Sequence, residues 1–290
     1  MNAKLEMILS MAAFGTLSLF IRRIPLSSAE VALFRAVIAL AAIALAKALR
    51  KKPLPLRRMG RDALLLFLSG AAMGFNWIFL FEAYKYTTVS VATLSYYFAP
   101  VIVMAACPIL FHERMTKKEV LCFAGSTIGL ILVINPSGNP GAGVDPIKGV
   151  LFGLAAAALY ATVILLNKQI SRVSGIDRTV LQFGAAIIVL APYILLTTGV
   201  HLEAMDPTGW LCLLAVGLLH SALAYVLYFS ALRALPGQEA AILSYIDPLV
   251  AVLLSLTLLR EPVSATQLIG GAMILTFTLA NELNPSKRGA

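Results

Sequence analysis

Two stretches of this sequence are related to each other, and their relation decides the fold. Residues 81–119 read FEAYKYTTVSVATLSYYFAPVIVMAACPILFHERMTKKE, and residues 229–267 read FSALRALPGQEAAILSYIDPLVAVLLSLTLLREPVSATQ. A shift of 148 residues places Pro100 on Pro248. Each stretch is a long apolar run with a proline inside it and a glutamate thirteen residues after that proline. A repeat at half the chain length predicts two copies of one structural unit.

The composition of the chain indicates a membrane protein. Hydrophobic residues make up 60% of its 290 residues and charged residues 13%. A soluble domain is about 45–50% apolar and about 25% charged. We therefore expect a lipid bilayer as the surroundings of the chain. The net charge of +9 then bears on orientation in the membrane, because loop Lys and Arg set topology, and we expect no nucleic acid partner.

Ten apolar runs approach the length of about 20 residues that a transmembrane helix needs. They cover roughly residues 5–21, 29–49, 63–83, 88–111, 118–135, 148–167, 178–198, 208–232, 237–259 and 264–282. Only short connectors separate them. The sequence thus predicts an all-α polytopic membrane protein with ten transmembrane helices, divided into five-helix units at residues 1–142 and 143–290.

The distribution of positive charge predicts the orientation. If the N-terminus is cytoplasmic, 17 of the 23 Lys and Arg residues fall in inner segments, 5 fall in outer segments, and Arg35 lies within a span. By the positive-inside rule both termini are cytoplasmic. Five spans per unit is an odd number, so the second unit enters the membrane from the opposite side. Such inverted repeats are typical of secondary transporters, which bind substrate near the midplane between the halves.

Three motifs carry a resemblance to a known family over the whole chain. Two are Pro100…Leu110-Phe-His-Glu113 and Pro248…Leu258-Leu-Arg-Glu261, and the third is Phe34-Arg35-Ala36. The chain resembles the drug/metabolite transporter superfamily, in its EamA-like ten-helix group, and is similar to bacterial aromatic amino acid exporters of the YddG type. The resemblance implies a central cavity lined by helices 1, 3, 4, 6, 8 and 9, with helices 5 and 10 at the periphery.

Aromatic residues inside the spans are the first candidates for substrate contact. They are Phe14, Trp77, Tyr97, Tyr160, Tyr225 and Tyr245. Four of them form two pairs at the 148-residue shift, and all lie on helices that the resemblance places around the cavity. Aromatic faces suit apolar or cationic groups, and tyrosine hydroxyls can bond a polar group. The alternative is packing or an interfacial aromatic belt.

Polar residues inside the spans are the second set of substrate-binding candidates. Asp247 is the foremost, because an ionisable group at the bilayer centre is costly and indicates function. It could pair with a substrate ammonium or carry a proton, or instead cap backbone that Pro248 leaves free. His220 titrates near neutrality but could equally be a neutral core residue. The remaining candidates are Asn76, Tyr96, Ser221 and Ser244, which could also simply bond neighbouring helices.

Several other residues have mechanical or structural interpretations. Pro100 and Pro248 lie near the middle of their spans, and we expect them to act as hinges when one half rocks against the other; a static kink is the alternative. Arg35 is expected to be structural, its stem snorkelling toward the outer interface. Glu113 and Glu261 are expected to hold helix ends together. Small residues four apart, such as 125 and 129, predict close helix packing.

The motifs that are absent narrow the function classes. The sequence has no Walker motif, no His-Glu-x-x-His or Gly-x-Ser-x-Gly string and no metal-ligand cluster, so we expect no cofactor, no metal and no enzyme. The favoured function is export of small metabolites across the bacterial inner membrane, above all amino acids including aromatic ones. Export of cationic or aromatic drugs, carriage of sugar-phosphates and a membrane-embedded lipid-active enzyme are the alternatives. Homodimerisation and proton coupling are left open.

Overall fold

The protein is a bundle of membrane-length helices. The computed structural model describes residues 2–49, 51, 60, 62–111, 115–134, 145–170, 173, 175–235 and 237–283. Every regular element within these ranges is a helix. By length and composition, seven helical segments in this part of the chain can cross a membrane, and two shorter apolar helical segments cover Ile242–Thr257 and Ala265–Asn281. The prediction of an all-helical, polytopic membrane protein is confirmed.

The elements follow the predicted runs to within a few residues. The first half contains α1 (Ala3–Ile21), α2 (Ser28–Leu49), α3 (Asp62–Tyr86), α4 (Val89–Tyr96), α5 (Ala99–Phe111) and α6 (Lys117–Ile134). The second half contains α7 (Pro146–Gln169), α8 (Gly175–Thr197), η2 (Leu202–Ala204), α9 (Pro207–Ala215), η3 (Val216–Leu223), α10 (Ala224–Ala234), α11 (Gly237–Ser244), α12 (Ile246–Thr257) and α13 (Ala265–Leu283).

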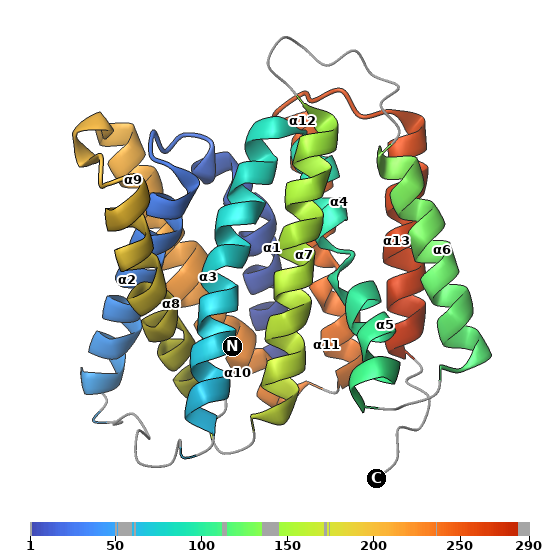
Figure 1. Ribbon diagram of the computed structural model, residues 1–290, viewed down its shortest axis with the longest axis horizontal. Coiled ribbons are helices and arrows are strands. Elements are labelled where there is room, and N and C mark those ends of the chain that lie inside the picture. The colour runs from blue at the N-terminus through green and yellow to red at the C-terminus, as the bar shows by residue number, and fades with distance from the viewer. Residues whose placement is uncertain are drawn as a thin grey trace.

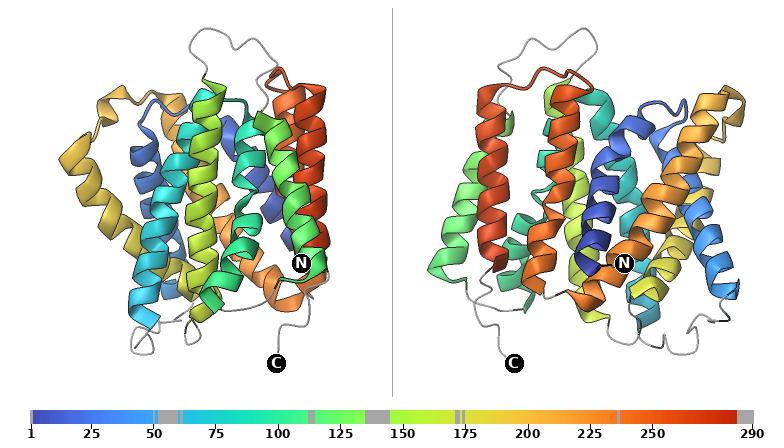
Figure 2. Two further views of the ribbon diagram at one scale, coloured as in Figure 1. Left: turned by 45° about the vertical axis from the view of Figure 1, so that its right-hand side comes forward. Right: turned by 180° about the vertical axis from the view of Figure 1, so that it is seen from behind.

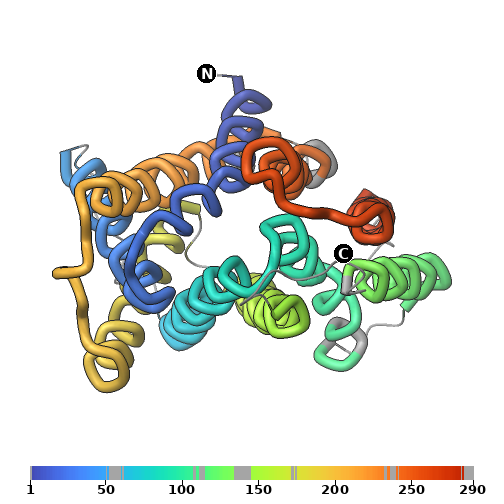
Figure 3. The backbone as a smooth tube through the Cα atoms, turned by 90° about the horizontal axis from the view of Figure 1, so that it is seen from above, coloured from blue at the N-terminus to red at the C-terminus, as the bar shows by residue number. Residues whose placement is uncertain are grey.

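The helices run roughly side by side, as Figures 1 and 2 show. Seen from above, α6 and α13 lie together at one edge of the molecule and α8 and α9 lie at the opposite edge (Figure 3). The elements α1, α3, α4, α7, α10 and α12 lie between these edges. The peripheral position of α6 and α13 agrees with what the family resemblance implies for helices 5 and 10.

Glycines set the close contact between α6 and α13. A Cβ on Gly270 would lie 2.4 Å from the Gly129 carbonyl oxygen, and a Cβ on Gly129 would lie 2.7 Å from the Gly270 carbonyl oxygen. Gly125 similarly leaves room for the ring of Phe277. The small residues therefore pack helices together, as predicted. Because α13 occupies this face of α6 within the chain, the face is not available for a dimer contact in this structure.

Two spans that the sequence presents as continuous are broken into two helices each. The break between α4 and α5 falls at Tyr97 and Phe98, and the break between α11 and α12 falls at Tyr245. A proline follows each break, Pro100 in the first turn of α5 and Pro248 in the first turn of α12. Proline has no N–H for the carbonyl four residues earlier, so the prolines mark the start of a new helix rather than a bend within one.

The starts of α6 and α13 have the same local structure. In α6, the Thr116 N–H donates to Glu119 Oε2 (2.7 Å) and the Glu119 N–H donates to Thr116 Oγ1 (3.3 Å). In α13, the Ser264 N–H donates to Gln267 Oε1 (2.9 Å) and the Gln267 N–H donates to Ser264 Oγ (3.2 Å). Both are capping boxes, and their residues align at the 148-residue shift. The α6 box lies at the lower end of the bundle in Figure 1 and the α13 box at the upper end.

The span between Pro207 and Ala234 contains a π-helical segment, η3, that the sequence did not reveal. Ser221 Oγ donates to the Val216 carbonyl oxygen at 2.8 Å, and His220 Nδ1 lies 3.2 Å from the Ala215 carbonyl oxygen. Both contacts reach five residues back along the chain. Single π turns of this kind occur frequently at functional sites.

Candidate functional site

The two broken helices meet through a hydrogen bond between Tyr97 and Asp247. The Tyr97 hydroxyl donates to Asp247 Oδ2 at 2.8 Å and lies 3.5 Å from the Ser244 carbonyl oxygen. In a continuous helix this carbonyl would accept a hydrogen bond from the N–H of residue 248, which Pro248 lacks. The ring of Tyr97 also faces that of Tyr245, with centroids 6.3 Å apart. A break in the first half of the chain thus contacts the corresponding break in the second half.

Neighbouring helices enclose this meeting point. On the α1 side, a Cβ on Gly15 would lie 2.6 Å from the Asp247 carbonyl oxygen, so α1 crosses the first turn of α12 with no room for a side chain. On the α7 side, the ring of Tyr96 lies 5.3 Å from that of Tyr160 and 6.0 Å from that of Tyr97. Tyr160 is 37% exposed. The tyrosines therefore form a group around Asp247.

Arg35 forms the centre of a second group. Only 2% of its surface is exposed, its Nε donates to Ser221 Oγ at 3.0 Å, and its Cζ lies 4.6 Å from the Trp77 ring centroid. The expectation that Arg35 snorkels toward an interface is wrong: its guanidinium turns inward. The neighbouring Glu30 is not its partner, since that carboxylate accepts the N–H groups of Ser27 and His201 instead.

A series of aromatic rings extends from Arg35 to α1. Trp77 packs edge-on against Phe183 of α8, with ring centroids 5.3 Å apart. Phe183 contacts Tyr225 at 5.4 Å, and Tyr225 contacts Phe14 at 5.3 Å. Three of the predicted aromatic residues are thus brought together, and Phe183 is the one that joins them.

The two groups belong to one electrostatic environment. Tyr84, Tyr96 and Tyr225 each lie close enough to interact with both Arg35 and Asp247. Arg35 and Asp247 do not form an ion pair with each other or with any other residue that the structure describes. Each group therefore contains one charged residue, and the same three tyrosines interact with both of them.

Two predicted residues, Asn76 and His220, bond other helices. Asn76 Nδ2 donates to the Ala156 carbonyl oxygen at 2.6 Å and so ties α3 to α7. His220 Nε2 lies 3.0 Å from Thr16 Oγ1, and its ring is 4.7 Å from that of Phe20, so it ties η3 to α1. These contacts support the structural interpretation of both residues. Within the described ranges, no group of three His, Cys, Asp or Glu residues could hold a metal ion.

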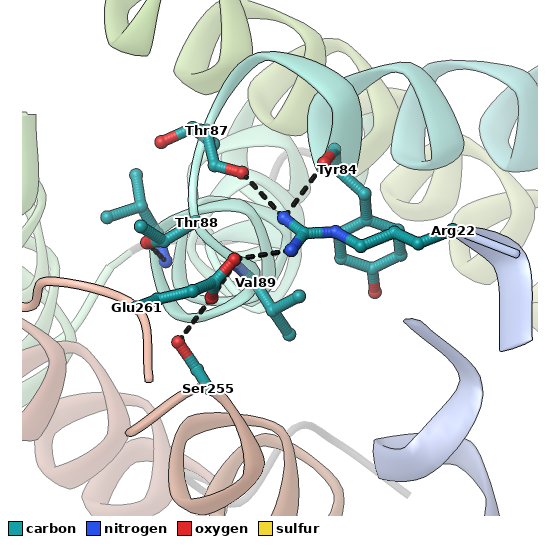
Figure 4. Close-up of polar contacts among 8 residues, drawn as sticks. Arg22, Tyr84, Thr87, Thr88, Val89, Ser255 and Glu261 are labelled. Carbon is teal, nitrogen blue, oxygen red and sulfur yellow. Dashed lines mark hydrogen bonds and ion pairs between the residues drawn. The ribbon is translucent and has the colours of Figure 1, made fainter. Parts of the chain in front are cut away.

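A polar network ties the ends of several helices together (Figure 4). Arg22, just beyond α1, donates from Nη1 to Glu261 Oε1 at 2.5 Å. Its Nη2 donates to the carbonyl oxygens of Tyr84 and Thr87 at 3.0 and 3.1 Å. The arginine therefore connects the end of α1 to the end of α3 and to the chain segment after α12.

Glu261 also binds the start of α4. Its Oε2 accepts the Val89 N–H at 2.8 Å and the Ser255 hydroxyl at 2.5 Å. A carboxylate at a helix N-terminus is favourable because it meets unpaired N–H groups and the positive end of the helix dipole. Glu261 thus joins helix ends, as expected, and it does so between the two halves of the chain. Its repeat equivalent, Glu113, lies outside the described residues.

Two of the features found in the structure were missed or undervalued by sequence reasoning. An ionisable residue within a span is itself a sign of function, and that sign applied to Arg35 as it did to Asp247. Phe183 has no such sign, because one phenylalanine in an apolar run is indistinguishable from a packing residue. Its position is evident only from the contacts of α8.

The sequence matches the model of the EamA-like transporter family over residues 3–135 and again over residues 147–281. An uncharacterized transporter of Archaeoglobus fulgidus is 31% identical over 94% of this chain and 93% of its own length. A protein of Salmonella typhimurium named "Probable amino-acid metabolite efflux pump" is 28% identical over 73% of this chain and 74% of its own. A solved crystal structure shares the fold, with a TM-score of 0.64, 19% identity and coverage of 99% and 98%.

Proposed function

Because the chain belongs to the EamA-like transporter family, within the drug/metabolite transporter superfamily, we propose that it exports small metabolites by alternating access, above all amino acids including aromatic ones. The observation that carries the proposal is the contact between Tyr97 and Asp247, in which two broken membrane helices meet at a half-buried carboxylate. Transporters typically build their substrate sites from discontinuous helices near the midplane.

The helix contacts support an inverted repeat with halves at residues 1–142 and 143–290. Exchanging each helix for its counterpart in the other half reproduces the observed neighbours. The contact of α3 with α7 corresponds to that of α10 with α1, and the contact of α3 with α8 corresponds to that of η3 with α2. The contact of α1 with α12 corresponds to that of α7 with α4 and α5. The two capping boxes at opposite ends of the bundle support the same relation. On this proposal the chain spans the membrane ten times.

The distribution of charge supports an orientation in the bacterial inner membrane. The start of α1, with Lys4, and the end of α2, with Lys47, lie at the lower end of the bundle in Figure 1. Most Lys and Arg residues of the sequence belong to segments that we assign to this end, and the positive-inside rule makes it cytoplasmic. Both termini are then cytoplasmic, and the network of Arg22 and Glu261 lies on the outer side.

The chemistry of the site supports an amino acid as substrate. Asp247 offers a carboxylate to an ammonium group, the tyrosine hydroxyls offer hydrogen bonds, and the aromatic faces suit an apolar side chain. The name of the Salmonella typhimurium relative points to the same class of substrate. Release to the outside then requires the contacts between Glu261, Arg22 and the start of α4 to separate.

Flux through proteoliposomes tests the proposal. The purified protein is reconstituted, and uptake of a panel of labelled amino acids is measured with and without a pH gradient, beside empty liposomes and a panel of cationic dyes. We expect saturable flux of at least one amino acid. Dye flux without amino acid flux would instead establish drug export, and lipid turnover without flux of any solute would establish an enzyme.

A further inference from the structure

We infer that Arg35 binds the carboxylate of the substrate, so that the site prefers an amino acid to the amine that lacks its carboxylate. The inference rests on the proposed function and adds to it a binding residue on α2, which is not among the cavity-lining helices that the family resemblance implies.

The first argument is the isolation of the Arg35 charge. The residue is 2% exposed and lies within a membrane helix. A buried charge without an opposite charge is strongly unfavourable. No carboxylate in the described part of the chain pairs with Arg35, and Glu30 on the same helix binds backbone N–H groups instead. The missing anion is therefore expected to arrive with the substrate.

The second argument is that the guanidinium is held in place with its terminal groups unused. Nε donates to Ser221 Oγ, and Ser221 in turn donates to the Val216 carbonyl oxygen in η3. The ring of Trp77 fixes the side chain through a cation–π contact. Neither Nη1 nor Nη2 has a hydrogen-bond partner among the described residues. A planar guanidinium presenting its N–H groups matches a carboxylate, which it can bind bidentately.

The third argument is the depth of the two charged groups within their membrane spans. Ser221 lies fourteen residues beyond Pro207 and Asp247 ten residues beyond Gly237, which correspond to about 20 Å and about 15 Å of helix. Both are near the middle of their spans, with Tyr96 and Tyr225 close to each charge. A substrate carboxylate at this depth would neutralise the charge of Arg35, whereas a simple amine would leave Arg35 without an anion.

The test compares an amino acid with the amine that lacks its carboxylate. L-phenylalanine and phenethylamine are offered to proteoliposomes of the wild type, Arg35→Met, Arg35→Lys and the exposed control Arg23→Met. We expect Arg35→Met to lower phenylalanine flux by at least about thirtyfold while phenethylamine flux is kept or increased. The phenylalanine flux of Arg35→Lys should lie between those of the wild type and Arg35→Met, because lysine retains the charge but not the planar guanidinium. The flux of Arg23→Met should match that of the wild type.

The melting temperature separates binding from a structural role. Removing an unpaired buried charge should leave the thermal stability of Arg35→Met unchanged or higher. Should that variant not fold, Ser221→Ala, which loosens the guanidinium, must lower phenylalanine flux selectively. An equal loss of flux for both substrates, together with a lower melting temperature, would overturn the inference. Unchanged phenylalanine flux in Arg35→Met would overturn it as well. A wild type that moves no amino acid would instead refute the proposed function, and the inference with it.

Discussion

At the scale of single residues, the Tyr97–Asp247 hydrogen bond explains how a carboxylate is kept inside the bundle. Asp247 is half-buried in the first turn of α12, and the Tyr97 hydroxyl from the other half of the chain is its side-chain partner at 2.8 Å. A hydrogen bond to a charged group contributes about 1.5–3 kcal/mol. The bond therefore holds the two breaks together, and on the proposed function a substrate ammonium would compete for the same oxygen.

Replacing either partner should weaken transport without loss of protein. We expect Asp247→Asn to reduce amino acid flux by about ten- to a hundredfold, since it removes the charge that we propose binds the substrate ammonium. Tyr97→Phe should reduce flux less. The double variant should be no worse than Asp247→Asn alone, because the two residues act through one contact. Proteoliposome flux normalised to protein level measures this, and unchanged flux of Asp247→Asn at all pH values would refute a role for the carboxylate.

Sequence reasoning predicted part of this site at the residue scale. Asp247 and the tyrosines were identifiable because ionisable and aromatic residues deep in a span are unusual. Their partners were not identifiable, because the contacts join distant parts of the chain: Arg35 and Ser221 are 186 residues apart. The hydrophobic periodicity of the two helices does not indicate this contact. The inward turn of Arg35 is decided by Trp77 and Ser221, which belong to other helices.

At the scale of elements, the breaks before Pro100 and Pro248 are the most consequential departure from the predicted helices. An apolar run shows where a chain crosses the membrane but not whether the helix is continuous. The prolines indicated disturbance, and the structure shows that each begins a second helix. Because Pro100 and Pro248 have no N–H for the carbonyls of Tyr96 and Ser244, we propose that the segments on either side of each break can change their relative angle.

Replacing the prolines should slow transport more than it weakens substrate binding. Pro100→Ala and Pro248→Ala each restore an N–H donor and allow the two segments to join into one stiffer helix. We expect the maximal flux to fall while the affinity for substrate is maintained. Pro192→Ala is the matched control, since Pro192 lies inside the uninterrupted helix α8 and should leave flux unchanged. Equal losses in maximal flux and affinity would count against a hinge.

The network around Glu261 should stabilise the fold measurably. Its carboxylate accepts from Arg22, the Val89 N–H and Ser255, and its side chain is 11% exposed. We expect Glu261→Ala to lower stability by about 2–3 kcal/mol, as expected for losing hydrogen bonds to a charged group. Thermal unfolding in detergent measures the change.

The control for this prediction is the ion pair at the end of α3. Glu82 and Lys85 lie 2.9 Å apart with side chains 23% and 46% exposed, and a pair this exposed contributes about 0–1 kcal/mol. Glu82→Gln should therefore barely change the unfolding temperature. If the two variants were equally stable, Glu261 would be a surface contact rather than a link between the halves.

At the scale of the whole molecule, hydrophobic runs predicted the helices and their order well, because the thickness of the bilayer fixes the length of a spanning element. The arrangement of the helices was less accessible. The internal repeat indicated that two units face each other. The packing of α3 against α8, however, depends on small residues such as Gly70, where a Cβ would lie 2.4 Å from the Gln182 carbonyl oxygen. One glycine in an apolar run does not reveal which helix it contacts.

The relation between the two halves is tested most directly by labelling two exposed, repeat-equivalent positions. Lys117 at the start of α6 and Ala265 at the start of α13 lie 148 residues apart and are both exposed. Each is replaced by cysteine in a background without the native cysteines, and intact cells are treated with a membrane-impermeant thiol reagent. We expect Ala265→Cys to be labelled from outside and Lys117→Cys only after permeabilisation. Labelling of both positions from the same side would contradict the inverted repeat and the transport site between its halves.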